Sequence, residues 1–361
     1  MLVTQKNLKS FLFLLTFGLI AWGGIKGTAL AWFALQSHSS GSNKSVILEI
    51  PRGKTAGSIS MELLEKGVIS DASKFLKLGK LMGWWKEVKA GEYEVTSNDS
   101  PVELFSKLTS GVSVSLPFVV REGENIYQIA DKLEERKPGE RKKFLSLVKD
   151  PEFMRSLGLQ DPLPPSLEGY LFPETYFFPR RIEAKEVIQK MFQQMDALWT
   201  EERHTKAQLL GMSQHEVLTL ASMVEKETGA AHERPVIASV FHNRLKRRQR
   251  LESDPTTIYG IWENFNGNLK RSHLRQKTKY NTYSFRGLPL GPIANPGVKS
   301  IDAALSPAKT EYLYFVSRND GTHIFTTNFK DHKKAVRDFQ LNPKAREGKS
   351  WRDLHKKEGT N

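Results

Sequence analysis

The sequence predicts an α+β protein with three parts: a single N-terminal transmembrane helix, a region of small β/α units, and a mixed α+β domain. Three observations lead to this prediction. An apolar run covers residues 11–35, two strand–turn–helix patterns recur within residues 45–135, and helical patterns with one hairpin signal fill residues 136–341. The remaining segments, 36–44 and 342–361, are typical of a Ser/Gly linker and of a polar, basic tail.

The apolar run 11–35 is long enough to cross a bilayer. A bilayer core needs roughly 20 apolar residues, and a single charge, Lys26, interrupts this run. Lys6 and Lys9 precede the run and few charges follow it directly, so we expect residues 1–10 to face the cytoplasm. The sequence thus predicts a single-pass protein of the cell (inner) membrane, with the remainder of the chain on the outer, periplasmic side.

The alternative for this segment is a cleaved signal peptide. Ala29, Leu30 and Ala31 resemble the small-x-small pattern at which such peptides are cut. Both alternatives export the bulk of the chain. Export favours a partner in the cell envelope over one in the cytoplasm.

The composition restricts the partners further. The 361-residue chain carries a formal net charge of +14 and has a sequence pI near 9.6, so an anionic partner is expected. Nucleic acid is not expected, because the basic residues are not interleaved with stacking aromatics and the topology places them outside the cell. The chain has no cysteine and its nine histidines show no metal-ligand spacing, so no metal or other cofactor is expected.

The region 45–135 contains two related patterns, 70 positions apart. Gly53 corresponds to Gly123, and the pairs Ile59/Ile129 and Leu63/Leu133 follow at the same spacing. Each copy reads as a β-rich run, a turn at Arg-x-Gly and an amphipathic helix. We therefore expect small β/α units in tandem.

A proline-rich stretch at 159–181 is a boundary within the region 136–341. Helices are predicted at about 183–200 and 214–228, and a further one starts near Pro235. A long loop rich in proline and glycine then precedes a hairpin signal with Asp320-Gly321 at the turn. The sequence "DHKKAVRDFQL" predicts a closing helix.

Two glutamates, Glu225 and Glu227, stand at the end of the helical pattern 214–228. On a helical wheel they flank opposite sides of the apolar face, so the wheel does not choose between them. Residues two apart are about 200° apart on a helix and cannot both reach one bond. The pair therefore cannot supply the two carboxylates that flank the bond in most glycosidases. The alternatives are a solvated helix end and a single catalytic carboxyl group.

A basic run, "FHNRLKRRQR", covers residues 241–250. One interpretation is a solvated helix end, where cations interact favourably with the negative end of the helix dipole. The other is attraction to an anionic polymer. The sequence leaves both open.

Seven motifs occur in one order: "EGYLFPETY", "ASMVEKET", "ERPVIASVFHNRL", "LESDPTTIYG", "YNTY", "GLPLGPIANPG" and "SPAKTEYLYFV". Together they resemble the endolytic murein transglycosylase family, also called MltG or YceG-like. The resemblance implies cleavage of the β-1,4 bond between N-acetylmuramic acid and N-acetylglucosamine in nascent glycan strands. It makes Glu227 the catalytic residue and 136–341 the catalytic domain. It also implies that Glu168 and Tyr170 lie near the cleft.

The same resemblance gives the region 45–135 a LysM-like, glycan-associated role. The expected partners are peptidoglycan glycan strands, the membrane and peptidoglycan synthases. An expected consequence of the cleavage is termination of strand elongation.

A lone glutamic acid is sufficient for lytic chemistry. A protonated carboxyl group donates to the leaving oxygen, and the C6 hydroxyl of the muramic acid then closes a 1,6-anhydro ring. Asp254, Asn281 and Tyr283 are the candidates for stabilising the oxocarbenium-like state. Their alternatives are structural: a helix cap for Asp254, and fixing of the loop for Asn281 and Tyr283.

Two other function classes remain open from the sequence. One is a non-catalytic wall-binding protein that acts as a scaffold for peptidoglycan synthases. The other is a membrane-tethered nucleic-acid binder, suggested by the net charge alone. Digestion of glycan strands separates the enzyme from the scaffold, and salt-dependent DNA binding that is specific over heparin would favour the nucleic-acid binder.

Overall fold

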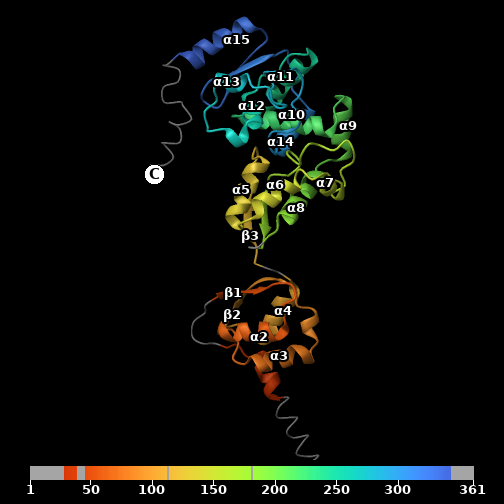
Figure 1. Cartoon of the computed structure of the whole chain (residues 1–361), viewed down its shortest axis with the longest axis vertical. Helices are drawn as coiled ribbons and strands as arrows, with labels where there is room; N and C mark the ends of the chain where they lie inside the picture. Colours follow the sequence, from red (N-terminus) through yellow and green to blue (C-terminus); the bar gives the residue numbers. More distant parts are fainter. Residues whose placement is uncertain (1–27, 39–44, 112–113, 180–181, 343–361) are drawn as a thin grey trace, which may run out of the picture. The chain divides into compact units, whose positions relative to one another are not determined.

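The computed structural model describes residues 28–38, 45–111, 114–179 and 182–342. The chain divides into two compact units (Figure 1). The first unit comprises residues up to 117 together with 177–180, and the second comprises 118–176 and everything from 181 onward. The predicted α+β class is confirmed by this mixture of short antiparallel pairs and many helices.

The predicted membrane span 11–35 lies largely outside the described residues. Its last part, 28–35, is helical, and Phe33 and Ala34 are buried in the hydrophobic core of the first unit. Within the described ranges, no helix is both long and apolar enough to cross a membrane.

The first unit packs its helices against one antiparallel pair of strands. Leu48 stands opposite Tyr93 in that pair, and both are buried. Thr55, Asp71 and Ser100 start three of the helices by accepting backbone N–H groups of the first turn. The elements are β1 (Ser45–Ile50), α2 (Ala56–Glu65), α3 (Ala72–Leu81), the short helix η1 (Trp84–Lys86), β2 (Gly91–Thr96) and α4 (Pro101–Ser110).

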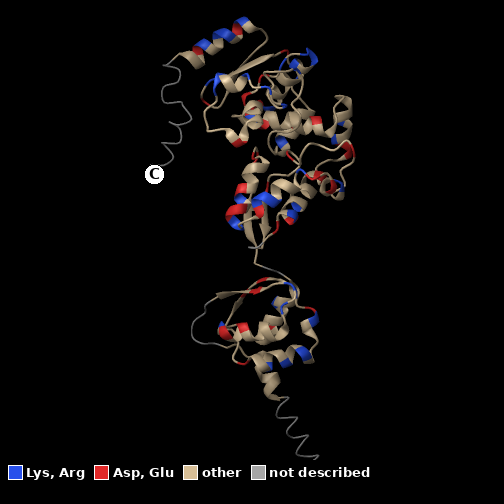
Figure 2. Cartoon of the chain, in the orientation of Figure 1, with Lys and Arg blue, Asp and Glu red and all other residues tan. Residues whose placement is uncertain are grey.

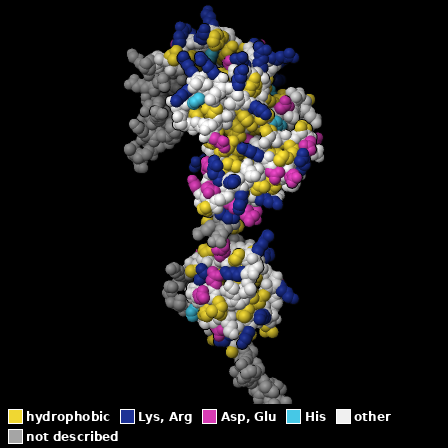
Figure 3. Space-filling model, in the orientation of Figure 1, with side chains coloured by type: hydrophobic (Ala, Val, Ile, Leu, Met, Phe, Trp, Pro, Cys, Tyr) yellow, Lys and Arg dark blue, Asp and Glu magenta, His cyan; other side chains and the backbone are white. Residues whose placement is uncertain are grey.

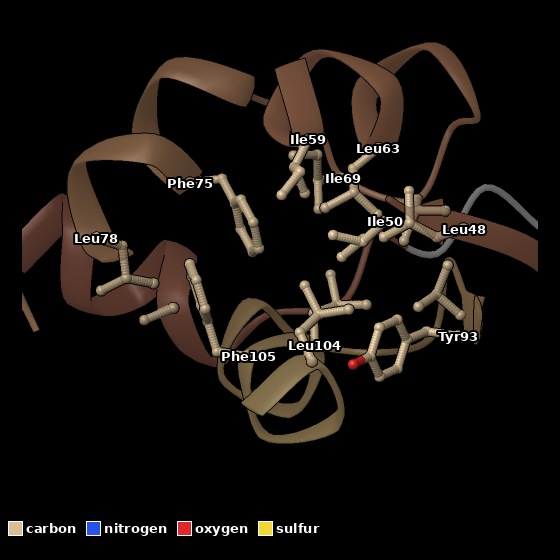
Figure 4. Close-up of a cluster of buried hydrophobic side chains, with 14 of the residues drawn as sticks. Leu48, Ile50, Ile59, Leu63, Ile69, Phe75, Leu78, Tyr93, Leu104 and Phe105 are labelled. Carbon is tan, nitrogen blue, oxygen red and sulfur yellow. The ribbon is translucent and has the colours of Figure 1, made fainter. Parts of the chain in front are cut away.

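The core of this unit lies between the strands and helices α2, α3 and α4 (Figure 4). The Phe75 and Phe105 rings stack with centroids 4.4 Å apart. Burial of these apolar side chains supplies the main favourable term for folding the unit. The buried side chains labelled in the figure are Leu48, Ile50, Ile59, Leu63, Ile69, Phe75, Leu78, Tyr93, Leu104 and Phe105.

Both copies of the predicted repeat form a strand, a turn and a helix. Gly53 and Gly123 have positive φ angles of 86° and 80°, which glycine adopts without strain. The first copy belongs to the first unit and the second copy to the second unit. The predicted boundary between 45–135 and 136–341 thus lies later in the chain than the division at 117, and the second copy's helix belongs to the larger unit.

The second unit is mainly helical. β3 (Leu116–Val119) pairs with β4 (Thr175–Phe178), and the division between the units falls within both strands. The predicted hairpin is confirmed as the antiparallel pair of β5 (Tyr314–Ser317) and β6 (His323–Thr326). The other elements are α5 (Ile126–Arg136), α6 (Glu140–Leu147), α7 (Pro151–Ser156), α8 (Ala184–Ala197), α9 (Glu201–Leu209), α10 (Gln214–Glu227), η2 (Ala231–Glu233), α11 (Arg234–Lys246), α12 (Asp254–Gly260), η3 (Trp262–Asn264), α13 (Arg271–Leu274), α14 (Val298–Leu305), α15 (Phe329–Val336) and η4 (Arg337–Leu341).

Helix α10 is central to the second unit. Ser213 and Glu216 form a capping box at its start, and every residue from 217 to 224 is buried. A helix that is buried on all sides must be surrounded by other elements, and α10 packs against α14, α11 and α12. The candidate active site lies at the C-terminal end of α10.

Candidate active site

Glu227 is the last residue of α10. The next residue, Thr228, has extended backbone angles, so the helix stops directly after the glutamate. The buried run 217–224 fixes the helix, and thereby fixes where its last side chain lies. Glu227 is partly exposed and lines a cavity of about 330 Å³.

Five segments of the second unit build the wall of this cavity. They are α10, α11, the stretch before and at the start of α12, the loop that carries Tyr283, and the β5–α15 region. The wall combines aromatic rings, which can lie against sugar rings, with a few charged groups. It consists of Glu227, Phe241, Arg244, Leu251, Glu252, Asp254, Tyr283, Tyr314, Phe315, Phe329 and His332.

The environment of Glu227 raises the pKa of its carboxyl group from its ordinary value of 4.5 to about 7. Burial is the main cause, because a low-dielectric setting disfavours the charged form. The negative charge of Asp254 adds to the increase, whereas the hydrogen bond from Ser253 and the positive charge of Arg244 oppose it. Near neutral pH, both protonation states of Glu227 are therefore populated.

Ser253 is the direct partner of Glu227. Its Oγ donates to Oε1 of Glu227 over 2.6 Å. Thr282 Oγ1 accepts the backbone N–H of Ser253 at 3.0 Å, and Thr256 Oγ1 donates to the Ser253 carbonyl at 2.6 Å. Ser253 is 2% exposed, so this buried hydroxyl network fixes one oxygen of the catalytic candidate.

Sequence reasoning missed Ser253, although it lies within the motif "LESDPTTIYG". Arg244 was also missed as a site residue. Its guanidinium group donates to the carbonyls of Leu313 at 2.6 Å and Leu251 at 2.8 Å, and it lies 5.1 Å from the centroid of the Tyr314 ring. Arg244 therefore fixes the cavity wall and supplies a positive charge there.

Asp254 and Tyr283 both line the cavity and contact each other. The Tyr283 hydroxyl donates to Asp254 Oδ1 over 2.7 Å. Burial and the neighbouring Asp254 charge raise the pKa of Tyr283 well above its ordinary value. The helix-cap alternative for Asp254 is not borne out, because the cap position of α12 is Ser253 and no side-chain cap bond is present there.

Asn281 is fully buried and does not line the cavity. Its Nδ2 donates to the carbonyls of Gln276 at 2.6 Å and Leu274 at 3.1 Å. Its Oδ1 accepts the backbone N–H of Tyr283 at 3.0 Å. The structure thus favours the loop-fixing role for Asn281, which places the backbone of Tyr283.

Residues 48–338 match the YceG-like family. The chain belongs to this family. The endolytic murein transglycosylase of Bacillus subtilis (strain 168) is 33% identical over 307 residues, covering 81% of this chain and 84% of that protein. The protein of the same name from Streptococcus pneumoniae serotype 2 is 27% identical over 362 residues, covering 91% of this chain and 65% of that longer protein.

A crystal structure of a YceG-like protein from Listeria monocytogenes is also similar. It is 33% identical to this chain, with a TM-score of 0.56, and the match covers 81% of this chain and 99% of the other. The resemblance found in the sequence is confirmed by these comparisons.

Two other family-motif residues of this YceG-like protein, Glu168 and Tyr170, lie apart from the cavity. Glu168 is 1% exposed and accepts hydrogen bonds from the Ile126 backbone N–H, the Tyr259 hydroxyl and Asn295 Nδ2, over 2.9 to 3.1 Å. The Tyr170 hydroxyl contacts His215 Nδ1 at 3.0 Å. Neither residue lines the Glu227 cavity, and both are buried within the second unit.

The carboxyl group of Glu225 accepts hydrogen bonds from other segments of the second unit. Arg234 Nη2 donates to its Oε1 over 3.1 Å, and the Gly297 backbone N–H donates to its Oε2 over 3.0 Å. Its side chain is 7% exposed. The structure therefore resolves what the helical wheel left open: Glu225 is used in packing and Glu227 faces the cavity.

Among the residues that the structure describes, no group of three or more His, Cys, Asp or Glu side chains is arranged to hold a metal ion.

Proposed function

We propose that this YceG-like protein is an endolytic peptidoglycan lytic transglycosylase. It cleaves the β-1,4 bond between N-acetylmuramic acid and N-acetylglucosamine and leaves a 1,6-anhydro-muramic acid end. The observation that carries the proposal is the Glu227 carboxyl group, whose pKa is raised to about 7, at the wall of a cavity with aromatic and charged side chains. The names of the relatives from Bacillus and Streptococcus support the same activity.

The first step uses the protonated form of Glu227. Its carboxyl proton passes to the glycosidic oxygen as the C1–O bond breaks, and positive charge develops on the muramic acid ring. A pKa near the working pH keeps the acid populated and still able to release its proton. Ser253 holds Oε1, which leaves Oε2 to carry the proton.

The second step uses the carboxylate that remains. It accepts the proton of the C6 hydroxyl while that oxygen attacks C1, so the ring closes and Glu227 is protonated again. Water is not consumed and no covalent enzyme intermediate forms. One carboxyl group therefore serves first as acid and then as base, which fits a site where Glu225 is engaged elsewhere.

The developing positive charge needs a negative partner. Asp254 lines the same cavity and is held by Tyr283, so the pair is suited to stabilise the oxocarbenium-like state. Asn281 contributes indirectly through the backbone of Tyr283.

The first unit is proposed to be a LysM-like, glycan-binding module. The strand–turn–helix pattern and the separate hydrophobic core support this, because the unit has its own packed interior. Removal of 45–111 is expected to weaken binding to intact cell wall more than it slows cleavage of short soluble glycans. Loss of activity on short glycans in a folded variant would instead make the unit part of the active site.

The membrane placement is proposed from the sequence. An anchor within residues 11–35 holds the chain in the cell membrane with the catalytic unit outside, where it meets nascent strands and peptidoglycan synthases and terminates elongation. A reporter that is active only in the cytoplasm is expected to stay silent when fused after Asn361. A positive signal would overturn both the topology and access to the substrate.

The activity is tested with uncrosslinked peptidoglycan and the full chain. Mass spectrometry is expected to show internal cleavage with products 18 Da lighter than hydrolytic ones, because a ring closure replaces the addition of one water, about 18 Da. Products with an ordinary reducing end would make the protein a hydrolase. No cleavage at all would leave the wall-binding scaffold as the function.

A further inference from the structure

A second cavity of about 400 Å³ adjoins the Glu227 cavity within the second unit. The two cavities share Arg244, Glu252 and Tyr314 in their walls. An extended polymer bound in the first cavity can therefore reach the second with a neighbouring substituent. The second cavity, named here the arginine pocket, is lined by Arg244, Arg247, Arg248, Gln249, Arg250, Glu252, Arg286 and Tyr314.

The charge of the arginine pocket is strongly unbalanced. Five arginines face one acid, Glu252, and that acid lies 3.5 Å from Arg244. Arg244 is further engaged with backbone carbonyls. Within the described part of the chain, no carboxylate lies within ion-pair distance of the other four guanidinium groups, and all four are exposed. Figure 3 shows Lys and Arg side chains gathered on the described surface at the α11 and α15 end of this unit, and the ribbon of Figure 2 marks Lys and Arg positions on both helices.

The backbone that forms the pocket is strained at one of these arginines. Helix α11 ends in a tight turn in which Arg248 N–H bonds the Leu245 carbonyl and Gln249 N–H bonds the Arg244 carbonyl, both at 2.9 Å. This pattern places a left-handed residue after the helix, a position at which glycine is usual. Arg248 occupies it with φ of 53°. A long cationic side chain at a glycine position indicates a use other than folding.

The helix dipole does not account for the pocket. Cations at the end of α11 interact favourably with its negative end, which explains a charge at Arg247. Arg286, however, comes from the loop between α13 and α14, 38 positions after Arg248. Guanidinium groups from two separate segments thus converge on one concave site beside the candidate acid.

We propose that the arginine pocket is a subsite for carboxylate groups of the peptide stem on a muramic acid residue next to the scissile bond. This inference rests on the proposed function. Each muramic acid carries its stem on a lactyl group, and the stem ends in free carboxylates. Guanidinium groups bind carboxylates through paired, charge-assisted hydrogen bonds, and arginine's planar fork suits that geometry. The pocket thus selects peptide-bearing strands over bare glycan.

The test measures binding rather than turnover. The full chain carrying Glu227→Gln is titrated with uncrosslinked strands that are free of lipid, with the same strands after conversion of their carboxylates to amides, and with strands that retain a lipid pyrophosphate. The double change Arg248→Gly and Arg286→Gln is then added. We expect about tenfold weaker binding to the native strands, since two charge-assisted contacts are lost. Binding to the amidated strands is expected to be unchanged by the double change and weaker than parent binding to native strands.

The variants separate this role from folding. Arg248→Gly relieves the strained turn, so its thermal midpoint is expected to equal or exceed that of the parent. The matched control removes two charges elsewhere in the same unit, with Lys185→Gln and Lys190→Gln on α8, which line neither cavity. These changes are expected to leave strand binding within twofold.

Three results would overturn the proposal. One is equal binding by the arginine variant and its parent. Another is an equal loss on native and amidated strands, which would show that the arginines bind sugar. The third is a loss seen only with strands that retain a lipid pyrophosphate, which would assign the pocket to phosphate. Formation of anhydro products by the chain with Glu227 intact is measured alongside, so failure of the subsite is distinguishable from failure of the proposed function.

Discussion

Two glutamates of the second unit share one property and differ in another. Burial raises the pKa of Glu168 to about 8 and that of Glu227 to about 7. Glu168 accepts three hydrogen bonds from three segments and lies away from the cavity, whereas Glu227 has one donor, Ser253, and lines the cavity. A raised pKa alone therefore does not identify a general acid; access to the reacting bond does.

The two environments also differ in what they hold together. Glu168 joins the start of α5 to Tyr259 of α12 and to Asn295 of the loop before α14. These segments are far apart in the chain, so the carboxyl group works as an internal cross-link. Glu227 joins only the end of α10 to Ser253. Substitution of Glu168 is thus expected to affect stability, and substitution of Glu227 to affect chemistry.

The largest expected effect is on activity. Glu227→Gln keeps the size and hydrogen-bonding capacity of the side chain but removes its titratable proton. We expect a loss of ~10²–10⁴-fold in anhydro-product formation, because one group serves as both acid and base. Thermal unfolding is expected to change little. Retained activity would move the acid elsewhere, and a collapse of stability would make Glu227 structural.

The next effect is on stability. Glu168→Ala leaves the Ile126 N–H, the Tyr259 hydroxyl and Asn295 Nδ2 without their common acceptor. We expect the unfolding free energy to fall by about 3–5 kcal/mol, measured by denaturant titration. The exposed Glu174 of the same motif is the control, and Glu174→Ala is expected to cost under about 0.5 kcal/mol. Equal effects of the two changes would contradict the cross-linking role.

An effect on stability that is smaller per pH unit concerns the titration of Glu168. The pKa of Glu168 is raised from 4.5 to about 8 in the folded state, so its contribution to stability is fully present below pH 4.5 and is lost as pH rises towards 8. The unfolding free energy of the parent is expected to fall by about 1.4 kcal/mol per pH unit in this window. Glu168→Gln cannot titrate, so the difference between the two proteins isolates the effect. Parallel pH profiles would show that Glu168 does not titrate on unfolding.

The smallest effect on activity is expected at Glu225. Glu225→Gln breaks its 3.1 Å ion pair with Arg234 but retains an oxygen for the Gly297 N–H. We expect under a tenfold loss of activity together with a modest fall in thermal midpoint. The comparison with Glu227→Gln uses the same helix and the same substitution. An inactive Glu225 variant would reverse the assignment of the acid.

The site residues that were predicted and those that were missed all lie in motifs. The missed residues act through contacts with side chains or carbonyls of other segments, which the motifs do not show. Glu227, Asp254 and Tyr283 were predicted and line one cavity. Ser253 was missed because its role depends on contact with a side chain 26 positions earlier. The helical wheel could not separate Glu225 from Glu227. The difference between them is that Arg234 and Gly297 donate hydrogen bonds to Glu225, and a helical wheel does not show contacts with other segments.

The local sequence pattern predicted individual strands, turns and helices better than it predicted which of them pack into the same unit. The two strand–turn–helix copies at Gly53 and Gly123 both formed, because turn and helix signals act over a few residues. Their assignment to different units is a matter of long-range packing, which the repeat does not encode. Glu168 is similar: its motif does not encode the three distant segments whose groups donate hydrogen bonds to its carboxyl group.

The central claim is that Glu227 works as the protonated acid, with its pKa set by its neighbours. The most direct measurement is kcat/KM for anhydro-product formation against pH, which reports the pKa of the free enzyme's acid. The parent is expected to lose activity as pH rises through about 7. Ser253→Ala removes a hydrogen bond that lowers this pKa and shifts the loss to higher pH. Asp254→Asn removes a charge that raises the pKa and shifts the loss to lower pH, whatever it does to the maximal rate. Opposite shifts in the two variants support the account. A loss of activity that stays at the same pH, or that shifts in the same direction in both variants, would contradict it.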